Sequence, residues 1–122
     1  MNEIILIVDD EPDIRFLLKR ILSSYKYEVK EAENIQQGLH VYTQFQPHIV
    51  VLDVNLPDGN GIQFASQFKL INNILILISA DNDQLTNEFK DYLADGFLRK
   101  PFTPSDLIEL IQEIKIKKKA IN

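Results

Sequence analysis

Uninterrupted apolar runs alternate along this chain with stretches in which apolar residues recur every three or four positions. Three runs, Ile4–Val8, Ile49–Leu52 and Ile74–Ile78, contain only apolar residues, most of them β-branched. Such runs are typical of strands that are covered on both faces. Tyr27–Ala32 alternates between apolar and polar residues, which predicts a half-exposed edge strand, and Gly96–Arg99 predicts a short strand.

Segments with helical spacing follow each of these strands. We predict helices over residues 12–24, 35–45, 62–71, 83–93 and 104–118, of which the fourth is the least apolar. Asn34 can cap the second helix and Pro47 ends it, whereas Thr103 or Ser105 lies near the cap of the last one. The strict alternation of five strands and five helices predicts an α/β fold, a parallel sheet with helices on both faces.

Length and composition narrow the class of protein. The 122 residues suggest a single domain over residues 1–122, and the 45% hydrophobic and 25% charged content is ordinary for a globular protein. The chain has no cysteine, which excludes disulfides and thiolate zinc sites and fits a cytoplasmic location. A net charge of −5 argues against direct nucleic-acid binding, and no apolar run is long enough for a membrane span or a signal peptide. The basic run Lys115–Lys119 suits the C-terminal end of a helix.

The candidate chemistry lies where the predicted strands end. Asp53 directly follows the buried run Ile49–Leu52 and precedes a turn-rich stretch with two glycines and a proline. The first, fourth and fifth strands end at Asp9, Ser79 and Lys100. Because ligands bind beyond the carboxyl ends of the strands in an open α/β sheet, these side chains are expected to meet at one edge.

Three consecutive carboxylates, Asp9, Asp10 and Glu11, follow the first strand. Helix capping and the helix dipole account for Glu11, Pro12 and Asp13 at the start of the next helix. Capping does not require both Asp9 and Asp10, which repel each other when both are ionised. A hard divalent cation such as Mg²⁺ would offset that repulsion.

A site that combines carboxylates, a divalent cation, a lysine and a hydroxyl is suited to phosphoryl groups. With Asp53 at its centre, the direct chemistry is attack of the carboxylate on phosphorus, which gives an acyl phosphate. The chain offers no cysteine and no glycine-rich phosphate loop as another route. His40 lies on a predicted helix and His48 at the far end of the Asp53 strand, so both are interpreted as structural or surface residues.

Motifs spread over residues 4–118 make the chain resemble the response-regulator receiver domains of two-component signalling. The matching pieces, in the family's order and spacing, are Val8–Pro12, Leu52–Asp53, Leu56–Pro57, Gly59–Gly61, Ile78–Ala80 and Phe97–Phe102. The resemblance implies a doubly wound, flavodoxin-like sheet of order 2-1-3-4-5. It also implies Mg²⁺-dependent phosphorylation by a histidine kinase or a histidine phosphotransfer protein, which would switch an output surface.

The resemblance also implies a role for each matching residue. Asp53 would be the phosphoacceptor, and Asp9, Asp10, Asp53 and the backbone carbonyl of Asn55 would hold Mg²⁺. Ser79 and Lys100 would bind the phosphoryl group, with Ala80 leaving room for it. Phe97 would be the switch aromatic, unless it is an ordinary core residue, and the peptide bond before Pro101 would be cis. A homodimer through the fourth helix, fifth strand and fifth helix is a further possibility, and no output partner is evident.

Some positions depart from the family's pattern, and two other functions stay open. Leu93 replaces a common glycine, the segment from Ser79 to Lys100 is about one residue short, and Phe97 replaces the commoner tyrosine. As a receiver domain, the chain would catalyse only its own phosphorylation and dephosphorylation. The alternatives are a pseudo-receiver that binds without being phosphorylated and an aspartyl-phosphate phosphatase of the haloacid-dehalogenase kind. The phosphatase usually needs a second aspartate at the position of Asn55, whose amide cannot transfer protons.

Overall fold

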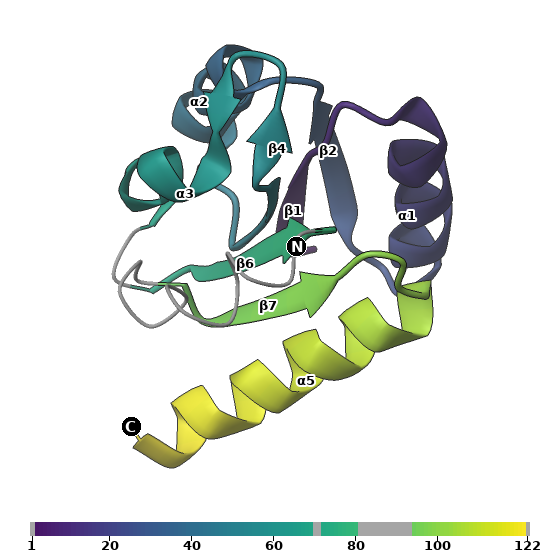
Figure 1. Cartoon of the computed structure of the whole chain (residues 1–122). Helices are drawn as coiled ribbons and strands as arrows, with labels where there is room; N and C mark the ends of the chain where they lie inside the picture. Colours follow the sequence, from purple (N-terminus) through teal and green to yellow (C-terminus); the bar gives the residue numbers. More distant parts are fainter. Residues whose placement is uncertain (1, 70–71, 81–93, 122) are drawn as a thin grey trace.

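A five-stranded parallel sheet forms the centre of the molecule (Figure 1). The structure, a computed structural model, describes residues 2–69, 72–80 and 94–121. The strands, in spatial order, are β2 (Glu28–Ala32), β1 (Ile4–Val8), β3 (Ile49–Asp53), β6 (Ile74–Ser79) and β7 (Gly96–Arg99). Numbered among themselves they have the order 2-1-3-4-5, which confirms the predicted doubly wound topology.

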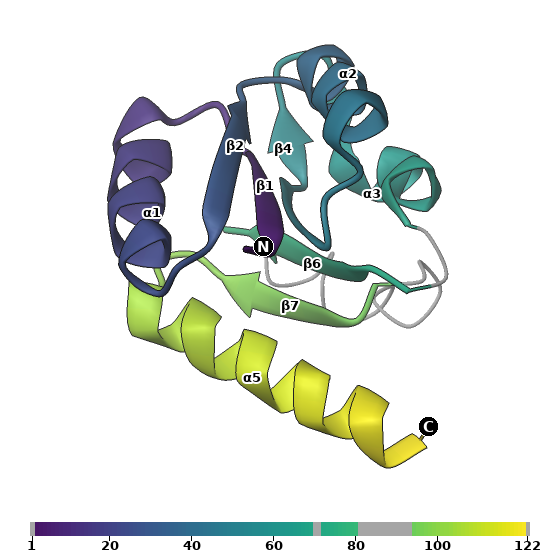
Figure 2. The same ribbon diagram turned by 180° about the vertical axis from the view of Figure 1, so that it is seen from behind.

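Helices cover both faces of the sheet, as predicted (Figures 1 and 2). The helices are α1 (Pro12–Ser24) and α5 (Pro104–Ile121) on one face, and α2 (Ile35–Phe45) and α3 (Gly61–Phe64) on the other. The alternation of side chains along each strand explains the two layers: Leu6 and Val8 of β1 pack toward α2, whereas Ile5 and Ile7 pack toward α1 and α5. Every residue of β3 and β6 is buried, as their unbroken apolar sequences predict.

The predicted helix starts are largely correct. Asn34 caps α2, because its side-chain oxygen accepts the N–H of Gln37 at 2.8 Å. At the start of α5, Thr103 and Asp106 exchange side-chain-to-backbone hydrogen bonds of 2.9 and 3.1 Å, so Thr103 is the cap residue. The helix α5 also continues beyond the predicted end at residue 118.

The segment after β3 differs from the prediction of a loop and one helix over residues 62–71. A small antiparallel hairpin, β4 (Asn55–Leu56) and β5 (Gly59–Asn60), precedes α3, which passes into the 3₁₀ helix η1 (Ala65–Phe68). Lys69 is already extended, and the buried amide of Asn73 donates to the carbonyl of Phe68 at 2.9 Å. This local hydrogen bond satisfies a carbonyl at the end of the helical segment, which stops before the predicted residue 71. The helix predicted over residues 83–93 lies outside the described residues.

Candidate functional site

Asp53 is held at the end of β3 by its own backbone and by the segment that follows. The side chain is buried, and its Oδ1 accepts the N–H of Asn55 at 3.0 Å. Gly61, at the start of α3, lies against the strand end: its N–H donates to the carbonyl of Val54 at 2.7 Å, and a Cβ at Gly61 would lie 2.3 Å from the carbonyl oxygen of Asp53. Only glycine permits this approach, so Gly61 helps to place the carboxylate.

Lys100 reaches back over the edge of the sheet to the carboxylates. Its Nζ lies 2.9 Å from Asp53 Oδ2, 2.8 Å from Glu11 Oε1 and 3.1 Å from Asp9 Oδ2. The Lys100 N–H donates to the carbonyl of Ser79 at 2.9 Å, which ties the residue to the end of β6. The Lys100–Pro101 peptide bond is cis, in agreement with the expectation. One lysine thus connects the ends of β1, β3 and β7.

Asp9 is fully buried and lacks part of its hydrogen bonding. Its Oδ1 accepts the N–H of Glu11 at 2.9 Å, while Oδ2 accepts no hydrogen bond from any described residue, although it forms the ion pair with Lys100. The Asp9 carbonyl accepts Arg15 Nη1 at 2.6 Å. A buried carboxylate oxygen without a donor is costly unless a cation satisfies it.

Glu11, which follows Asp9 and Asp10 after β1, contacts Lys100 and does not cap the helix with its side chain. Glu11 occupies the N-cap position of α1, but its side chain makes no capping hydrogen bond and instead pairs with Lys100. The dipole interpretation of Glu11 therefore missed its principal contact. The sequence signal was present, because a third carboxylate directly follows Asp9 and Asp10.

Burial raises the pKa of both inner carboxylates. For Asp9, burial outweighs the hydrogen bond from the Glu11 N–H, and the charge of Asp53 raises the pKa further. For Asp53, burial outweighs the hydrogen bonds from Lys100 and from the Asn55 N–H. Burial lowers the pKa of Lys100, but its hydrogen bonds to Glu11 and Asp53 outweigh burial and raise it. The lysine stays charged and only partly compensates the carboxylates.

These carboxylates fit a hard divalent cation. Asp9, Asp10, Glu11 and Asp53 each offer an oxygen, and the four oxygens lie within 4.8 Å of one another. Two of the residues are buried and two are exposed, so a cation could bind protein oxygens on one side and water on the other. The acidic cluster is thus consistent with a Mg²⁺ site. It includes Glu11, which the sequence interpretation left out.

The remaining predicted residues lie around this centre. Ser79 is buried at the end of β6, one residue beyond the pairing partner of Asp53, and Ala80 is exposed beside it. Phe97 is half-buried in β7 and packs against the core on the α2 side. Asn55 is exposed in β4.

Both histidines lie away from the carboxylate cluster, as interpreted. His48 lies at the opposite end of β3, where its Nδ1 accepts the N–H of Ile4 at 3.0 Å. His40 is exposed on α2.

Comparison with known proteins identifies the family. The sequence profile of the response regulator receiver domain matches residues 5–112. The chain belongs to the response regulator receiver family. It is 34% identical over 118 residues to the chemotaxis protein CheY of Thermotoga maritima, an alignment that covers 93% of this chain and 98% of that protein. The predicted family is therefore confirmed, and the family is not a conventional enzyme family.

Solved structures agree with this assignment. A two-component response regulator from Clostridium difficile shares the fold, with a TM-score of 0.87 over 96% of this chain and 98% of that one, at 20% identity. The response regulator protein TrrA of Thermotoga maritima, solved in complex with Mg(2+)-BeF, has a TM-score of 0.81 and 31% identity over 92% of this chain and 98% of that one.

This receiver domain has the acidic pocket of Asp9, Asp10 and Asp53 that is typical of phosphorylatable response regulators. Within the part of the chain that the structure describes, no helix is long and apolar enough to cross a membrane.

Proposed function

We propose that this receiver domain is a signalling switch that is turned on by phosphorylation of Asp53. The observation that carries the proposal is the contact of Lys100 Nζ with Asp53 Oδ2 at 2.9 Å, beside the buried and unsatisfied Asp9 Oδ2. A carboxylate, a fixed ammonium group and a cation-binding cluster together form the arrangement that phosphoryl transfer needs. The match to the response regulator receiver family supports the proposal.

In the proposed reaction, a carboxylate oxygen of Asp53 attacks the phosphorus of a phosphohistidine. A P–O bond forms, the P–N bond breaks and the electron pair leaves with the imidazole nitrogen, so that an acyl phosphate results. Lys100 would bind a phosphoryl oxygen, and the hydroxyl of Ser79 would donate to another. Hydrolysis of the acyl phosphate by water would reset the switch.

Asp9, Asp10 and Asp53 would hold Mg²⁺, with the carbonyl of Asn55 as a further ligand. The cation would supply charge neutralisation for the transferring phosphoryl group. TrrA, which is 31% identical, is a relative solved with Mg(2+)-BeF, and that complex supports the proposal. The orphaned oxygen of Asp9 supports it independently.

The phosphoryl donor would be a sensor histidine kinase or a histidine phosphotransfer protein, and the domain would act in the cytoplasm as one receiver unit over residues 1–122.

The output partner is open. Phosphorylation adds about two negative charges, and Ser79 with Phe97 would convey the change to the surface of β7 and α5. A homodimer through that surface would include residues 83–93, which lie outside the described residues.

Intact mass spectrometry tests the proposal. Incubation with acetyl phosphate and Mg²⁺ should raise the mass by one phosphoryl group, and omission of Mg²⁺ should prevent the rise. Asp53→Asn should stay unmodified, whereas Asp13→Asn, an exposed change in the first turn of α1, should be modified like the parent protein. A parent protein that takes up no phosphoryl group would instead be a pseudo-receiver.

A further inference from the structure

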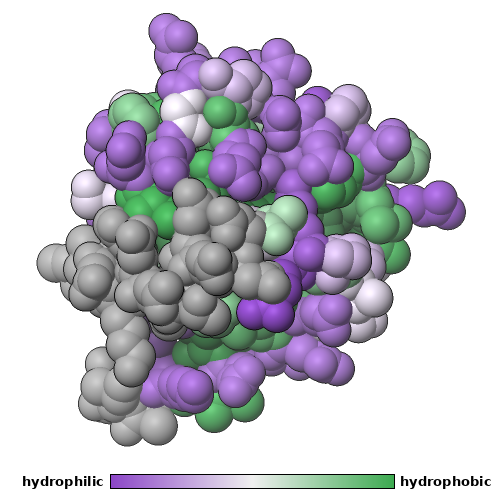
Figure 3. Space-filling view, in the orientation of Figure 1, coloured by the Kyte–Doolittle hydropathy of each residue, from purple (hydrophilic) through white to green (hydrophobic). Residues whose placement is uncertain are grey.

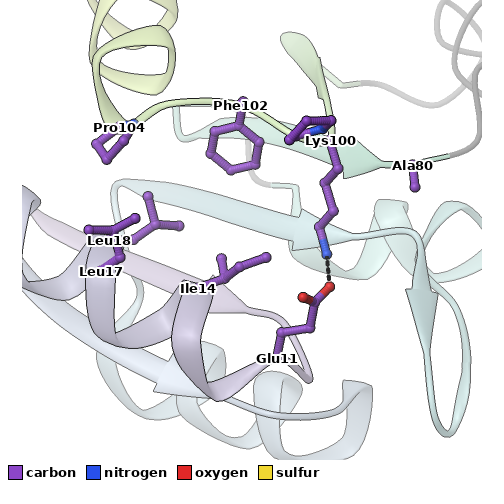
Figure 4. Close-up of a pocket in the computed structure, with 9 residues that line it drawn as sticks. Glu11, Ile14, Leu17, Leu18, Ala80, Lys100, Phe102 and Pro104 are labelled. Atoms are coloured by element: carbon purple, nitrogen blue, oxygen red, sulfur yellow. Dashed lines mark hydrogen bonds and ion pairs between the residues drawn. The ribbon is translucent and has the colours of Figure 1, made fainter.

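Glu11 is the exposed member of the group of carboxylates that share Lys100. It lies 2.8 Å from Lys100 Nζ, and its side chain is 56% exposed, compared with 0% for Asp9 and 4% for Asp53. The residue comes from the loop between β1 and α1, and its carboxylate points at the ammonium group of Lys100 (Figure 4).

Lys100 already makes two hydrogen bonds and one further ion pair to carboxylates. Nζ donates to Glu11 Oε1 at 2.8 Å and to Asp53 Oδ2 at 2.9 Å, and it forms an ion pair with Asp9 Oδ2 at 3.1 Å. A phosphoryl oxygen that approaches Nζ therefore competes with these carboxylates for the ammonium group. Of the three carboxylates, Glu11 is the one that can turn into solvent, because Asp9 is buried and Asp53 is the residue that the proposed reaction modifies.

The surroundings leave Glu11 one way to withdraw. Glu11 and Lys100 form the polar end of a cavity of about 400 Å³ between α1 and the segment that leads into α5 (Figure 4). The remaining lining is mostly apolar and includes Ile14, Leu18 and Phe102. A carboxylate would lose its hydration inside that cavity, so Glu11 must turn toward water.

Building on the proposed function, we infer that Glu11 is a positioning residue that competes with the phosphoryl group for Lys100. Its ion pair holds Lys100 in place before phosphorylation and opposes the phosphorylated state afterwards. Removal of this competitor should therefore strengthen the binding of a phosphoryl group at Asp53.

Beryllofluoride, a non-covalent mimic of the phosphoryl group, provides the test. Its dissociation constant is measured at saturating Mg²⁺ by titration of backbone amide signals, for the parent protein and for Glu11→Gln, Glu11→Asp and Asp13→Asn. Glu11→Gln should bind beryllofluoride about two- to fivefold more tightly, the range expected when an exposed charge pair is removed. Glu11→Asp should also bind more tightly, because it keeps the charge but has a shorter reach. Asp13→Asn removes an exposed charge nearby and should leave the affinity unchanged.

Three outcomes would contradict the inference. Equal or weaker binding by Glu11→Gln would show no competition, and equal tightening in Asp13→Asn would show general charge repulsion. The third outcome comes from a separate Mg²⁺ titration. A tenfold loss of Mg²⁺ affinity in Glu11→Gln would identify Glu11 as a metal ligand. If the parent protein binds no beryllofluoride and takes up no phosphoryl group, the proposed function itself is wrong.

Discussion

Two lysines, one at the carboxyl ends of the strands and one at their amino ends, are equally buried but have different charged partners. The side chain of Lys100 is 14% exposed at the carboxyl edge, and that of Lys69 is 13% exposed at the amino edge. Lys100 meets three carboxylates. Among the described residues Lys69 meets one carboxylate, Asp95 at 3.0 Å, which also pairs with Lys118 at 3.2 Å and accepts the N–H of Leu75 at 2.8 Å.

Because their partners differ, the pKa values of the two lysines are shifted in opposite directions. Burial lowers the pKa of Lys69, and the contacts with Asp95 do not fully offset it. Lys100 has a raised pKa because its carboxylate partners outweigh the same burial effect. At the amino edge, as far as the structure describes it, two cations share one anion, and the Leu75 N–H adds a hydrogen bond to it. At the carboxyl edge the described carboxylates Asp9, Asp10, Glu11 and Asp53 outnumber Lys100, an excess of negative charge that is consistent with a cation site.

Among the described residues, exposed large hydrophobic side chains lie on α1 and α5, the helices of one face of the sheet. Phe16 and Leu17 of α1 are 69% and 47% exposed, and hydrophobic surface is visible over α1 on the right of Figure 3. Leu17 also lines the cavity beside Lys100. The carboxyl edge therefore combines excess negative charge with neighbouring apolar surface.

The largest effect is expected where a backbone contact supports the site. Gly61→Ala would place a Cβ 2.3 Å from the Asp53 carbonyl oxygen, and neither backbone can yield easily, so we expect a loss of about 3 kcal/mol in the free energy of unfolding. At the other edge, Gly96→Ala would meet the flexible end of Ile114 at 2.9 Å and should cost about 1 kcal/mol. Urea unfolding measures both. Equal losses would mean that Gly61 does not support the site as described.

Breaking the cluster at the amino edge should have the next largest effect. Asp95→Ala leaves the Leu75 N–H without its acceptor and Lys69 without its carboxylate, and we expect a loss of about 2 kcal/mol. Glu113→Ala on α5 is the matched control: its pair with Lys117 is exposed and 3.9 Å long, so the change should stay within about 0.5 kcal/mol. Similar small losses in both variants would show that the Asp95 cluster contributes little.

The smallest effect should have the opposite sign. Asp53→Asn relieves the excess negative charge at the carboxyl edge and should raise the free energy of unfolding at pH 7 by about 1 kcal/mol. The folded-state pKa of Asp53 is raised above its ordinary 3.8, so the ionised carboxylate opposes folding at neutral pH. The penalty disappears as the pH falls through the raised pKa toward 3.8, because the folded state takes up its proton first.

Unfolding curves of the parent protein and Asp53→Asn between pH 7 and pH 4 would measure this difference. It should shrink as the pH falls. A constant difference, or a variant less stable than the parent at pH 7, would show that Lys100 fully compensates the site. The removal of Asp53 would then cost a favourable ion pair.

Local patterns in the sequence determined most of the architecture and the main members of the site. The runs before Asp9, Asp53 and Ser79 are apolar and mostly β-branched, so they predict strands that are buried on both faces. Parallel strands bring their carboxyl ends to one edge, which made the meeting of Asp53 and Lys100 predictable. The cap at Asn34 was also predictable, since it acts on the next few residues.

Tertiary structure alone decided the contacts that join distant parts of the chain. Asp58 binds the N–H groups of Ile35 and Gln36 at 2.8 and 2.9 Å, although more than twenty residues separate them. Glu11 reaches Lys100 across 89 positions. Local propensity has no information about such partners, because each contact exists only after the sheet has brought two segments together. The same assembly leaves Asp9 Oδ2 buried without a hydrogen-bond donor among the described residues, a property that no residue has on its own.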